Sequence, residues 1–284
     1  MIALFALLSS ITFVKSRSYS DPITFYNSSI SQNPKNALMY TNRGVVKVKM
    51  GDFHGAINDF TKAIELKPED VVAYSNRGVA YSSIGRLERA IEDYGKAIEL
   101  NPDYAGVYIN WGKACQAGGD FDTAIKKYNK AIELNPNYAD AYYNLGEAFV
   151  GLDRYDEAWE SFNQAIKIKP DYAKAHYQIG FVYSKLGRYQ EELESYKQAI
   201  RINPYYAEAH YNLGVACGVL GRHQDAINSF RQAVRIKPDF ADAHFNLGVT
   251  YLIIGDKDSA AQEYKILKTL GAGQADQLYN LIHQ

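Results

Sequence analysis

Three histidines have the regular spacing of a metal-ligand series. His176, His210 and His244 lie 34 residues apart, and imidazole is the commonest metal ligand among side chains. A shared zinc ion needs nitrogen atoms at about 2 Å, whereas side chains on successive packed helices lie about 10 Å apart. The same register elsewhere in the chain holds Tyr40, Tyr74, Tyr108 and Tyr142. We therefore interpret the histidines as packing residues and predict no metal site.

The remaining reactive side chains do not form a catalytic pattern. Cys115 and Cys217 are separated by three intervals of 34 residues, which places them too far apart for a disulfide. Two buried free thiols favour a reducing compartment. Gly112 and Lys113 are followed by Ala114 and lack the glycine spacing of a phosphate-binding loop. No Ser/His/Asp or paired-carboxylate arrangement stands apart from the 34-residue register, so we expect no catalytic residue and no cofactor.

Prolines and glycines set the period of the whole chain. Seven of the eight prolines are evenly spaced, at Pro34, Pro68, Pro102, Pro136, Pro170, Pro204 and Pro238. One glycine register is Gly44, Gly78, Gly112, Gly146, Gly180, Gly214 and Gly248. A second is Gly51, Gly85, Gly119, Gly187, Gly221 and Gly255, with Asp153 in the remaining place. An active site does not need one residue type at seven even intervals, whereas a stacked repeat does.

Each period predicts a helical hairpin. We number positions from the start of a unit, so that the first full unit is 37–70 and the proline is at position 32. Apolar or small residues at positions 4, 7, 8 and 11, and again at 20, 24 and 27, share helix faces because they lie three or four residues apart. Glycine at 15 ends the first helix with a positive φ, and proline at 32 stops the second. One hairpin cannot bury its apolar face alone, so neighbours must stack.

These residues resemble the tetratricopeptide repeat. The stretch 141–170, "AYYNLGEAFVGLDRYDEAWESFNQAIKIKP", is very similar to its consensus. The resemblance implies an all-α fold, an α-solenoid in which helix-turn-helix repeats form a right-handed superhelix. The units are 37–70, 71–104, 105–138, 139–172, 173–206, 207–240 and 241–274. The local departures are Arg43 and Arg77 at position 7, Lys47 at 11, Glu192 at 20 and Leu267 at 27.

The two ends of the chain carry further predicted segments. Residues 1–18 begin with "MIALFALLSSITFV", which is too short for a membrane span of about 20 residues. They are either the first helix of a degenerate eighth repeat or a targeting segment, unless the start of the chain is misassigned. Residues 19–36 are then the second helix of that repeat, capped and started by Asp21 and Pro22. We interpret 274–284 as a capping helix that covers the last apolar face with Leu278 and Leu281.

The family resemblance also implies where a ligand binds. The first helices of such repeats line a concave groove that holds peptide segments of partner proteins, through positions 2, 5, 6, 9, 12 and 13. Amides at position 6 offer donors and an acceptor to an extended peptide backbone, although the scaffold itself could equally hold them. Position 5 changes from Thr41, Ser75 and Ile109 to aromatic rings, which we expect to face the groove and not the core. The predicted groove residues are Asn76, Asn110, Tyr143, Asn144, Tyr177, Gln178, Tyr211, Asn212, Phe245 and Asn246.

Charge on the second helices changes at the same place. Positions 26 and 29 are lysine and glutamate in the first three repeats: Lys62 with Glu65, Lys96 with Glu99, and Lys130 with Glu133. The next three repeats carry Gln164 with Lys167, Gln198 with Arg201, and Gln232 with Arg235. The array therefore has two blocks that meet near residue 139. Recent duplication within each block, or a binding surface in the second, would leave this pattern.

These patterns predict a non-enzymatic scaffold for protein–protein interaction. Its partner is a protein or peptide, and we expect no small-molecule substrate. The net charge of −1 gives no electrostatic case for nucleic acid or an anionic membrane, so membrane contact could involve only residues 1–18. The chain lacks the lysines of the family's carboxylate clamp, because only Lys174 holds position 2 and no lysine holds position 5.

Two alternatives remain open at this point. One is a non-catalytic arm of a multi-chain enzyme, such as a protein glycosyltransferase. The other is a self-assembling scaffold that docks through Val249, Leu252 and Ile253. The sequence favours a cytoplasmic location, or an exported or membrane-associated one if residues 1–18 act as a targeting segment.

Overall fold

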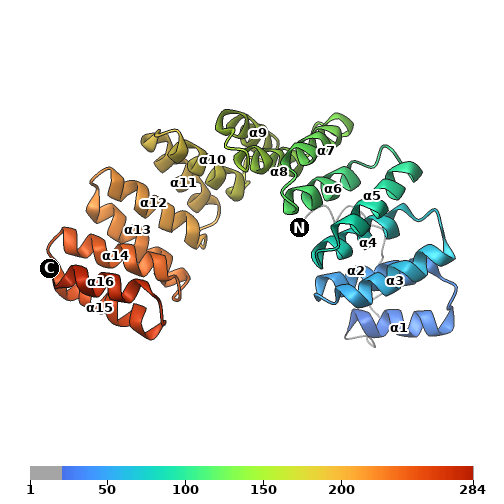
Figure 1. The fold of residues 1–284 in the computed structure, drawn as a ribbon, viewed down its shortest axis with the longest axis horizontal. Helices are drawn as coiled ribbons and strands as arrows, with labels where there is room; N and C mark the ends of the chain where they lie inside the picture. The colour runs from blue at the N-terminus through green and yellow to red at the C-terminus, as the bar shows by residue number, and fades with distance from the viewer. Residues whose placement is uncertain (1–20, 284) are drawn as a thin grey trace. The chain divides into compact units, whose positions relative to one another are not determined.

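The computed structural model describes residues 21–283, which form α-helices joined by short turns (Figure 1). The prediction for residues 1–18 lies outside these residues. The helices group into two compact units, the first ending at Leu152 and the second beginning at Asp153. The first unit contains α1 (Pro22–Gln32), α2 (Ala37–Lys49), α3 (Phe53–Leu66), α4 (Val71–Ser83), α5 (Leu87–Leu100), α6 (Ala105–Ala117), α7 (Phe121–Leu134) and α8 (Ala139–Val150).

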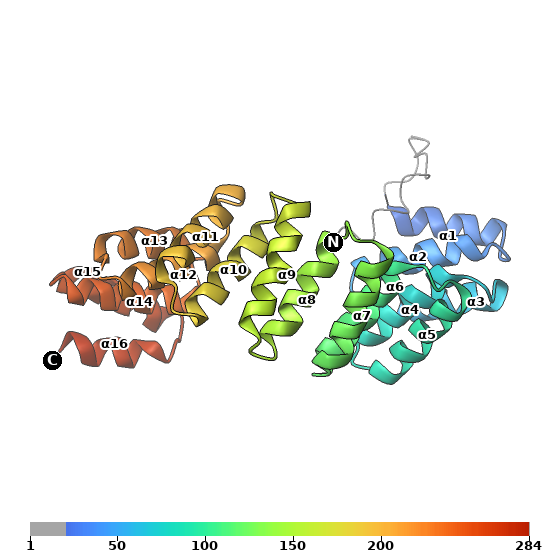
Figure 2. The ribbon, with the colours of Figure 1, turned by 90° about the horizontal axis from the view of Figure 1, so that it is seen from above.

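The second unit repeats this plan. Its helices are α9 (Tyr155–Ile168), α10 (Ala173–Lys185), α11 (Tyr189–Ile202), α12 (Ala207–Val219), α13 (His223–Ile236), α14 (Ala241–Ile253), α15 (Lys257–Thr269) and α16 (Gln274–Ile282). Within each unit, helices that follow one another in the chain pack side by side (Figure 2). The fold is therefore all-α and of the solenoid class, as predicted.

We name the helices by their place in the hairpin. The even-numbered helices α2 to α14 are A helices, and the odd-numbered helices α1 to α15 are B helices. Each A helix from α2 to α14, apart from α8, packs closely on the B helix that follows it within the same unit. The repeat boundaries of the sequence analysis fit these pairs, and we retain them as a proposal.

The turns inside the hairpins need a left-handed backbone. Glycine at position 15 has a positive φ wherever it occurs, for example 80° at Gly51 and 84° at Gly255. Asp153, which replaces it once, also has a positive φ of 56°. The predicted reason for glycine at this position is thereby confirmed, because side chains rarely adopt this conformation.

Close packing inside each hairpin depends on glycine at position 8. A β-carbon added at Gly112 would lie 2.5 Å from the Tyr128 ring, and one added at Gly180 would lie 2.6 Å from the Tyr196 ring. The aromatic side chain at position 24 thus fills the space that glycine leaves. In the last repeat the same place opposite Gly248 is taken by Leu278 of α16.

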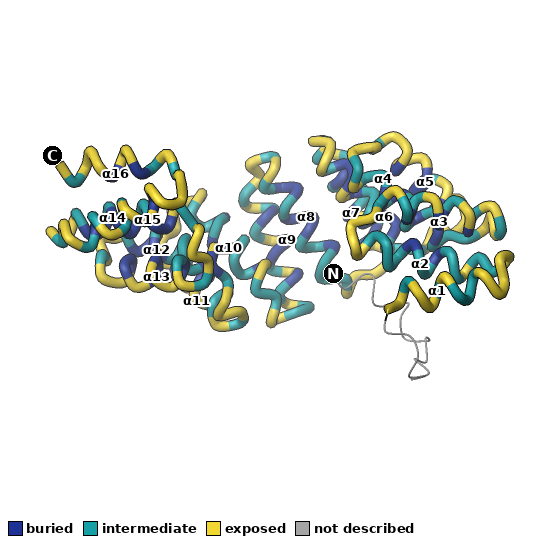
Figure 3. Tube along the Cα trace, turned by 90° about the horizontal axis from the view of Figure 1, so that it is seen from below, coloured by how far each residue is buried: buried dark blue, intermediate teal, exposed yellow. Residues whose placement is uncertain are grey.

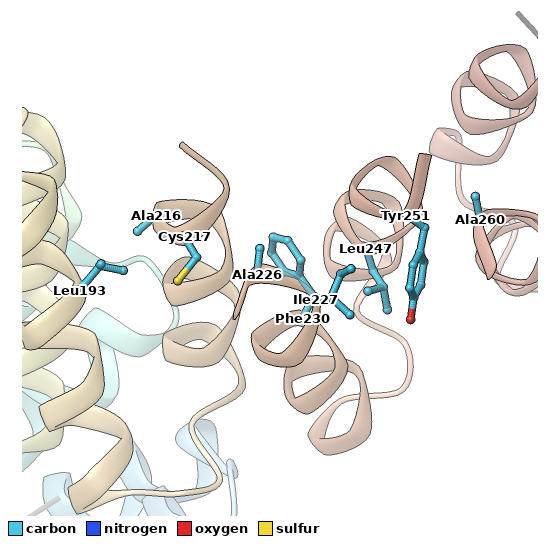
Figure 4. Close-up of a cluster of buried hydrophobic side chains, with 9 residues drawn as sticks. All are labelled: Leu193, Ala216, Cys217, Ala226, Ile227, Phe230, Leu247, Tyr251 and Ala260. Atoms are coloured by element: carbon cyan, nitrogen blue, oxygen red, sulfur yellow. The ribbon is translucent and has the colours of Figure 1, made fainter. Parts of the chain in front are cut away.

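The core of the second unit extends across successive hairpins. Figure 3 shows that buried residues lie within the helices and that most turns are exposed. A cluster in the second unit joins α11 to α15 and consists of Leu193, Ala216, Cys217, Ala226, Ile227, Phe230, Leu247, Tyr251 and Ala260 (Figure 4). Each repeat therefore buries its apolar face against its neighbour.

Polar residues replace part of this core in the first unit. Arg77 donates to both carboxylate oxygens of Asp93, at 2.8 and 2.7 Å, and to Thr61 of the preceding repeat at 3.1 Å. Arg43 pairs in the same way with Asp59 and donates to Asn27 of α1 at 2.7 Å. The two arginines at position 7 are thus each paired with a buried aspartate and linked to the previous B helix.

The ends of the described chain are capped. Asp21 accepts hydrogen bonds from the backbone amides of Ile23 and Thr24, both at 3.2 Å, so the predicted start of α1 is confirmed. In α16, Leu278 is fully buried against the last hairpin. Leu281 is 40% exposed, and Ile282 packs inward in its place. The prediction for Leu281 was wrong: residues three and four after Leu278 both lie on its side of the helix, and it is Ile282 that packs against the last hairpin.

Candidate peptide-binding face

Three A helices of the second unit present apolar side chains at four-residue intervals. This spacing puts positions 5, 9 and 13 on one side of each helix. We call this set the apolar face; it consists of Tyr177 and Phe181 on α10, Tyr211, Val215 and Val219 on α12, and Phe245, Val249 and Ile253 on α14. Position 13 of α10 is Lys185, a cation at the edge of the face. Exposure increases along the helices, since the residues at positions 5 and 9 are half-buried while Val219 and Ile253 are 59% and 58% exposed.

The tyrosines of this face also belong to the packing between repeats. The Tyr177 ring lies 5.6 Å from the Tyr196 ring and 5.0 Å from the Tyr206 ring. Tyr211 repeats the arrangement one unit later, with Phe230 at 5.8 Å and Phe240 at 4.9 Å. The expectation that these rings face the groove and not the core therefore needs correction, because each ring is half-buried between two hairpins.

Amides at position 6 connect successive rings. Asn212 donates to the Tyr177 hydroxyl at 2.9 Å, and Asn246 donates to the Tyr211 hydroxyl at 3.0 Å. Burial raises the pKa of Tyr177, and the hydrogen bond from Asn212 partly opposes this change. Each amide therefore uses one donor to hold the ring of the preceding repeat, and Gln178 lies half-buried on α10.

The predicted residues of the first unit have a different environment. Asn110 donates to the Ser75 hydroxyl at 3.4 Å, and Asn76 is half-buried. Asn144 is buried and donates to a carbonyl of its own helix at 2.5 Å, while the Tyr143 hydroxyl donates to Glu147 at 2.7 Å. Position 5 is buried in the first three repeats, where Thr41, Ser75 and Ile109 are at most 5% exposed.

Each histidine of the series contacts a proline carbonyl oxygen in the loop before its helix. His176 Nε2 lies 3.1 Å from the carbonyl oxygen of Pro170, six residues earlier, and His210 has the same contact with Pro204. The Tyr108 hydroxyl donates to Pro102 at the same distance, so the two residue types have one role at position 4. Among the described residues, no group of three or more His, Cys, Asp and Glu side chains is placed to hold a metal ion.

His244, the last of the series, is buried and has an additional partner. Its Nδ1 lies 2.6 Å from Glu263 Oε2, and its Nε2 lies 3.0 Å from the carbonyl oxygen of Pro238. Burial by itself lowers the pKa of His244, but the hydrogen bonds to Glu263 and Pro238 raise it overall. This pair joins α14 to α15 and has the geometry of an internal ion pair.

At the exposed end of the apolar face, the sequence analysis named Ile253 as part of a docking edge but missed Val219. Both side chains lie in the last turn of their helices. Lys185 occupies the equivalent place on α10, with its ammonium 5.2 Å from the Phe181 ring. The signal was present, because both aliphatic residues lie eight residues after the aromatic residue at position 5.

No described helix has the length and apolar character needed to cross a membrane.

Stacked helical hairpins with this residue pattern define a protein of the tetratricopeptide-repeat class. Residues 26–279 match the family described as the cilia and flagella-associated protein 70 C-terminal domain. Because the match covers most of the chain, the chain belongs to this family of tetratricopeptide-repeat domains. No curated protein sequence matches the chain significantly.

Solved structures with the same architecture are numerous. A MamA protein is 32% identical, with a TM-score of 0.51, and the match covers 61% of this chain and 94% of that one. YrrB, described as a TPR protein with an unusual peptide-binding site, is 29% identical, with a TM-score of 0.52 and coverage of 65% and 95%. PilF of Pseudomonas aeruginosa is 20% identical, with a TM-score of 0.65 and coverage of 75% and 99%, and shows likeness of fold alone.

Proposed function

We propose that this chain is a non-enzymatic scaffold that binds a peptide segment of a partner protein on the apolar face. The observation that carries the proposal is the run of apolar side chains on three adjacent A helices, which ends in the exposed Val219 and Ile253. Clustered exposed apolar side chains on a soluble protein are typical of interaction sites. The similarity to YrrB, whose description names a peptide-binding site, supports the same function.

Each group has a proposed part in binding. The aliphatic side chains and the outer edges of Tyr177, Tyr211 and Phe245 take apolar anchors of the peptide, since aromatic residues supply much contact area for few torsions. The amides Gln178, Asn212 and Asn246 hydrogen-bond the peptide backbone with the donor and acceptor that remain after their contacts in the scaffold. Asn76, Asn110, Tyr143 and Asn144 stay a separate proposal for peptide contacts within the first unit. We expect an affinity of about 1 μM, or about −8 kcal/mol.

The test starts from peptides selected on the wild-type chain from a displayed random library. Val219→Asp together with Ile253→Asp should weaken the selected peptide by about 2–4 kcal/mol in isothermal titration, because charges replace apolar anchors. Both side chains are more than half exposed, so we expect the melting temperature to change little.

A matched control uses exposed aliphatic side chains on a B helix. Ile91 and Leu100 of α5 are each 37% exposed, and Ile91→Asp with Leu100→Asp introduces the same charges away from the apolar face. This pair should bind the peptide as the wild type does. Equal weakening in both double variants, or none in either, would show that the apolar face is not the site. Tyr177→Ala is less suitable, because that change also removes contacts with Tyr196 and Tyr206.

The alternatives are separated by two further measurements. Self-assembly through Val249, Leu252 and Ile253 predicts a mass above that of one chain in light scattering. Val249 and Leu252 already pack against the cluster around α16, which leaves Ile253 as the exposed member of this edge. An arm of a glycosyltransferase predicts sugar transfer that appears only when a catalytic chain is added.

A further inference from the structure

The B helices of the second unit carry a row of exposed cations that the first unit lacks. Position 29 is Lys167 on α9, Arg201 on α11 and Arg235 on α13, each in the last turn of its helix. All three side chains are exposed, and we call this set the cationic row. It lies on B helices, whereas the apolar face lies on A helices.

In the first unit, the corresponding lysine on each B helix is neutralised by an ion pair with glutamate. At the equivalent places Lys62 pairs with Glu65 at 2.9 Å, Lys96 with Glu99 at 2.7 Å, and Lys130 with Glu133 at 2.8 Å. In the second unit the partner position holds glutamine, and within the described residues none of the three cations makes an ion pair. Asp171 and Asp239, in the loops that follow α9 and α13, make no ion pair among the described residues either.

Helix electrostatics explain single cations at these places but not the row. A positive charge near a helix C-terminus is favourable by a few tenths of a kcal/mol. In the first unit, α3, α5 and α7 have no basic residue in the last turn. Lys169 and Lys237 add two more cations at the ends of α9 and α13, where their ammonium groups lie over Tyr172 and Phe240 at 4.6 and 4.9 Å. One edge of the unit therefore collects five positive charges.

We propose that the cationic row binds an acidic polypeptide segment of a partner. The B helices α9, α11 and α13 pack on the A helices between them and not closely on one another, so the three cations are spaced more widely than the roughly 8–10 Å of directly packed helices. An extended polypeptide advances about 3 Å per residue. A segment with a carboxylate at every third residue therefore offers a negative charge about every 9 Å and can place carboxylates near all three cations.

Charge complementarity and the overall charge of the chain favour a narrow acidic ligand. The carboxylates nearer the N-termini of α11 and α13 are already paired, Glu191 with Arg188, Glu194 with Lys197 and Asp225 with Arg222, so they do not compete for the row. The net charge of −1 gives a broad anionic membrane or a nucleic acid little overall attraction, whereas an extended peptide can contact the row alone.

The test uses a fluorescein-labelled peptide of five Glu-Pro-Ser triplets and measures its anisotropy against the full chain. The wild type should bind at low ionic strength and lose about tenfold or more in affinity by 0.3 M salt, since exposed charges are then screened within about 6 Å. Lys167→Gln, Arg201→Gln and Arg235→Gln combined should weaken binding about tenfold or more. Arg201→Gln alone should weaken it by a smaller factor.

The first unit supplies the matched control. Lys62→Gln, Lys96→Gln and Lys130→Gln remove the same charge from the equivalent B helices, three positions earlier, and should leave the affinity within about twofold. Absence of binding by the wild type, or equal loss in both triple variants, would overturn the proposal. Two further results would also overturn it: row-dependent binding of anionic vesicles without peptide binding, and a concentration-dependent dimer that only the row variant loses. The peptide with glutamine in place of glutamate should not bind.

Discussion

At the scale of single residues, Glu192 is the least expected feature of the chain. The equivalent position holds a fully buried alanine in the other repeats: Ala56, Ala90, Ala124, Ala158, Ala226 and Ala260. Glu192 is itself 3% exposed, and its Oε2 has no hydrogen-bond partner in the described structure. Burial raises the pKa of Glu192, although a hydrogen bond with the Ser184 side chain partly opposes this. A buried carboxylate with an unsatisfied oxygen destabilises the fold.

We predict that Glu192→Ala stabilises the chain, and that the gain depends on pH. Because the folded-state pKa of Glu192 lies above its unfolded value, the folded state prefers the neutral acid. The penalty is therefore absent below about pH 4 and complete only above the folded pKa. Urea unfolding should show a gain of about 1–3 kcal/mol at about pH 8 and little gain near pH 4. A gain of equal size at both pH values would contradict an electrostatic cause.

At the scale of the helical hairpin, glycine has two roles that the structure separates. A β-carbon at Gly180 would lie 2.6 Å from the Tyr196 ring, whereas one at Gly218, also within an A helix, meets nothing within 4 Å. Gly180→Ala should therefore destabilise by about 1–3 kcal/mol through overpacking. Gly218→Ala should stabilise by about 0.5–1 kcal/mol, because alanine restricts the unfolded chain. Thermal unfolding of the two variants measures the difference, and shifts of the same sign would contradict the packing argument.

Most of the hairpin could be predicted from the sequence because its signals are local. Proline at position 32 and glycine at position 15 end helices through their own backbone conformations, so even the substitute Asp153 was placed correctly in the left-handed turn. The pairing of Arg77 with Asp93 could not be predicted with the same ease, because it joins residues 16 positions apart on two helices. For the candidate site, spacing identified the rings of Tyr177 and Tyr211. Their burial depends on Tyr206 and Phe240 at the start of the next hairpin.

At the scale of the whole molecule, stability should be shared between neighbouring repeats. The second unit buries Ile227 and Phe230 of one repeat against Leu247 and Tyr251 of the next, and α16 closes the end with Leu278. No single centre holds the fold together, since each hairpin contacts mainly its neighbours. Loss of the last hairpin therefore uncovers one apolar face and leaves the contacts of the earlier repeats in place.

We therefore predict that a chain lacking residues 241–284 remains folded, becomes less stable and binds apolar dyes. Its helical circular dichroism should fall roughly in proportion to the residues removed, because α1 to α13 retain their own contacts. Its melting temperature should drop, since the side chains that faced Leu247 and Tyr251 now meet water. A chain lacking only 274–284 should show a smaller drop, because α16 covers less of the array. Complete loss of helical signal in the longer deletion would show a single cooperative core and contradict the nearest-neighbour account.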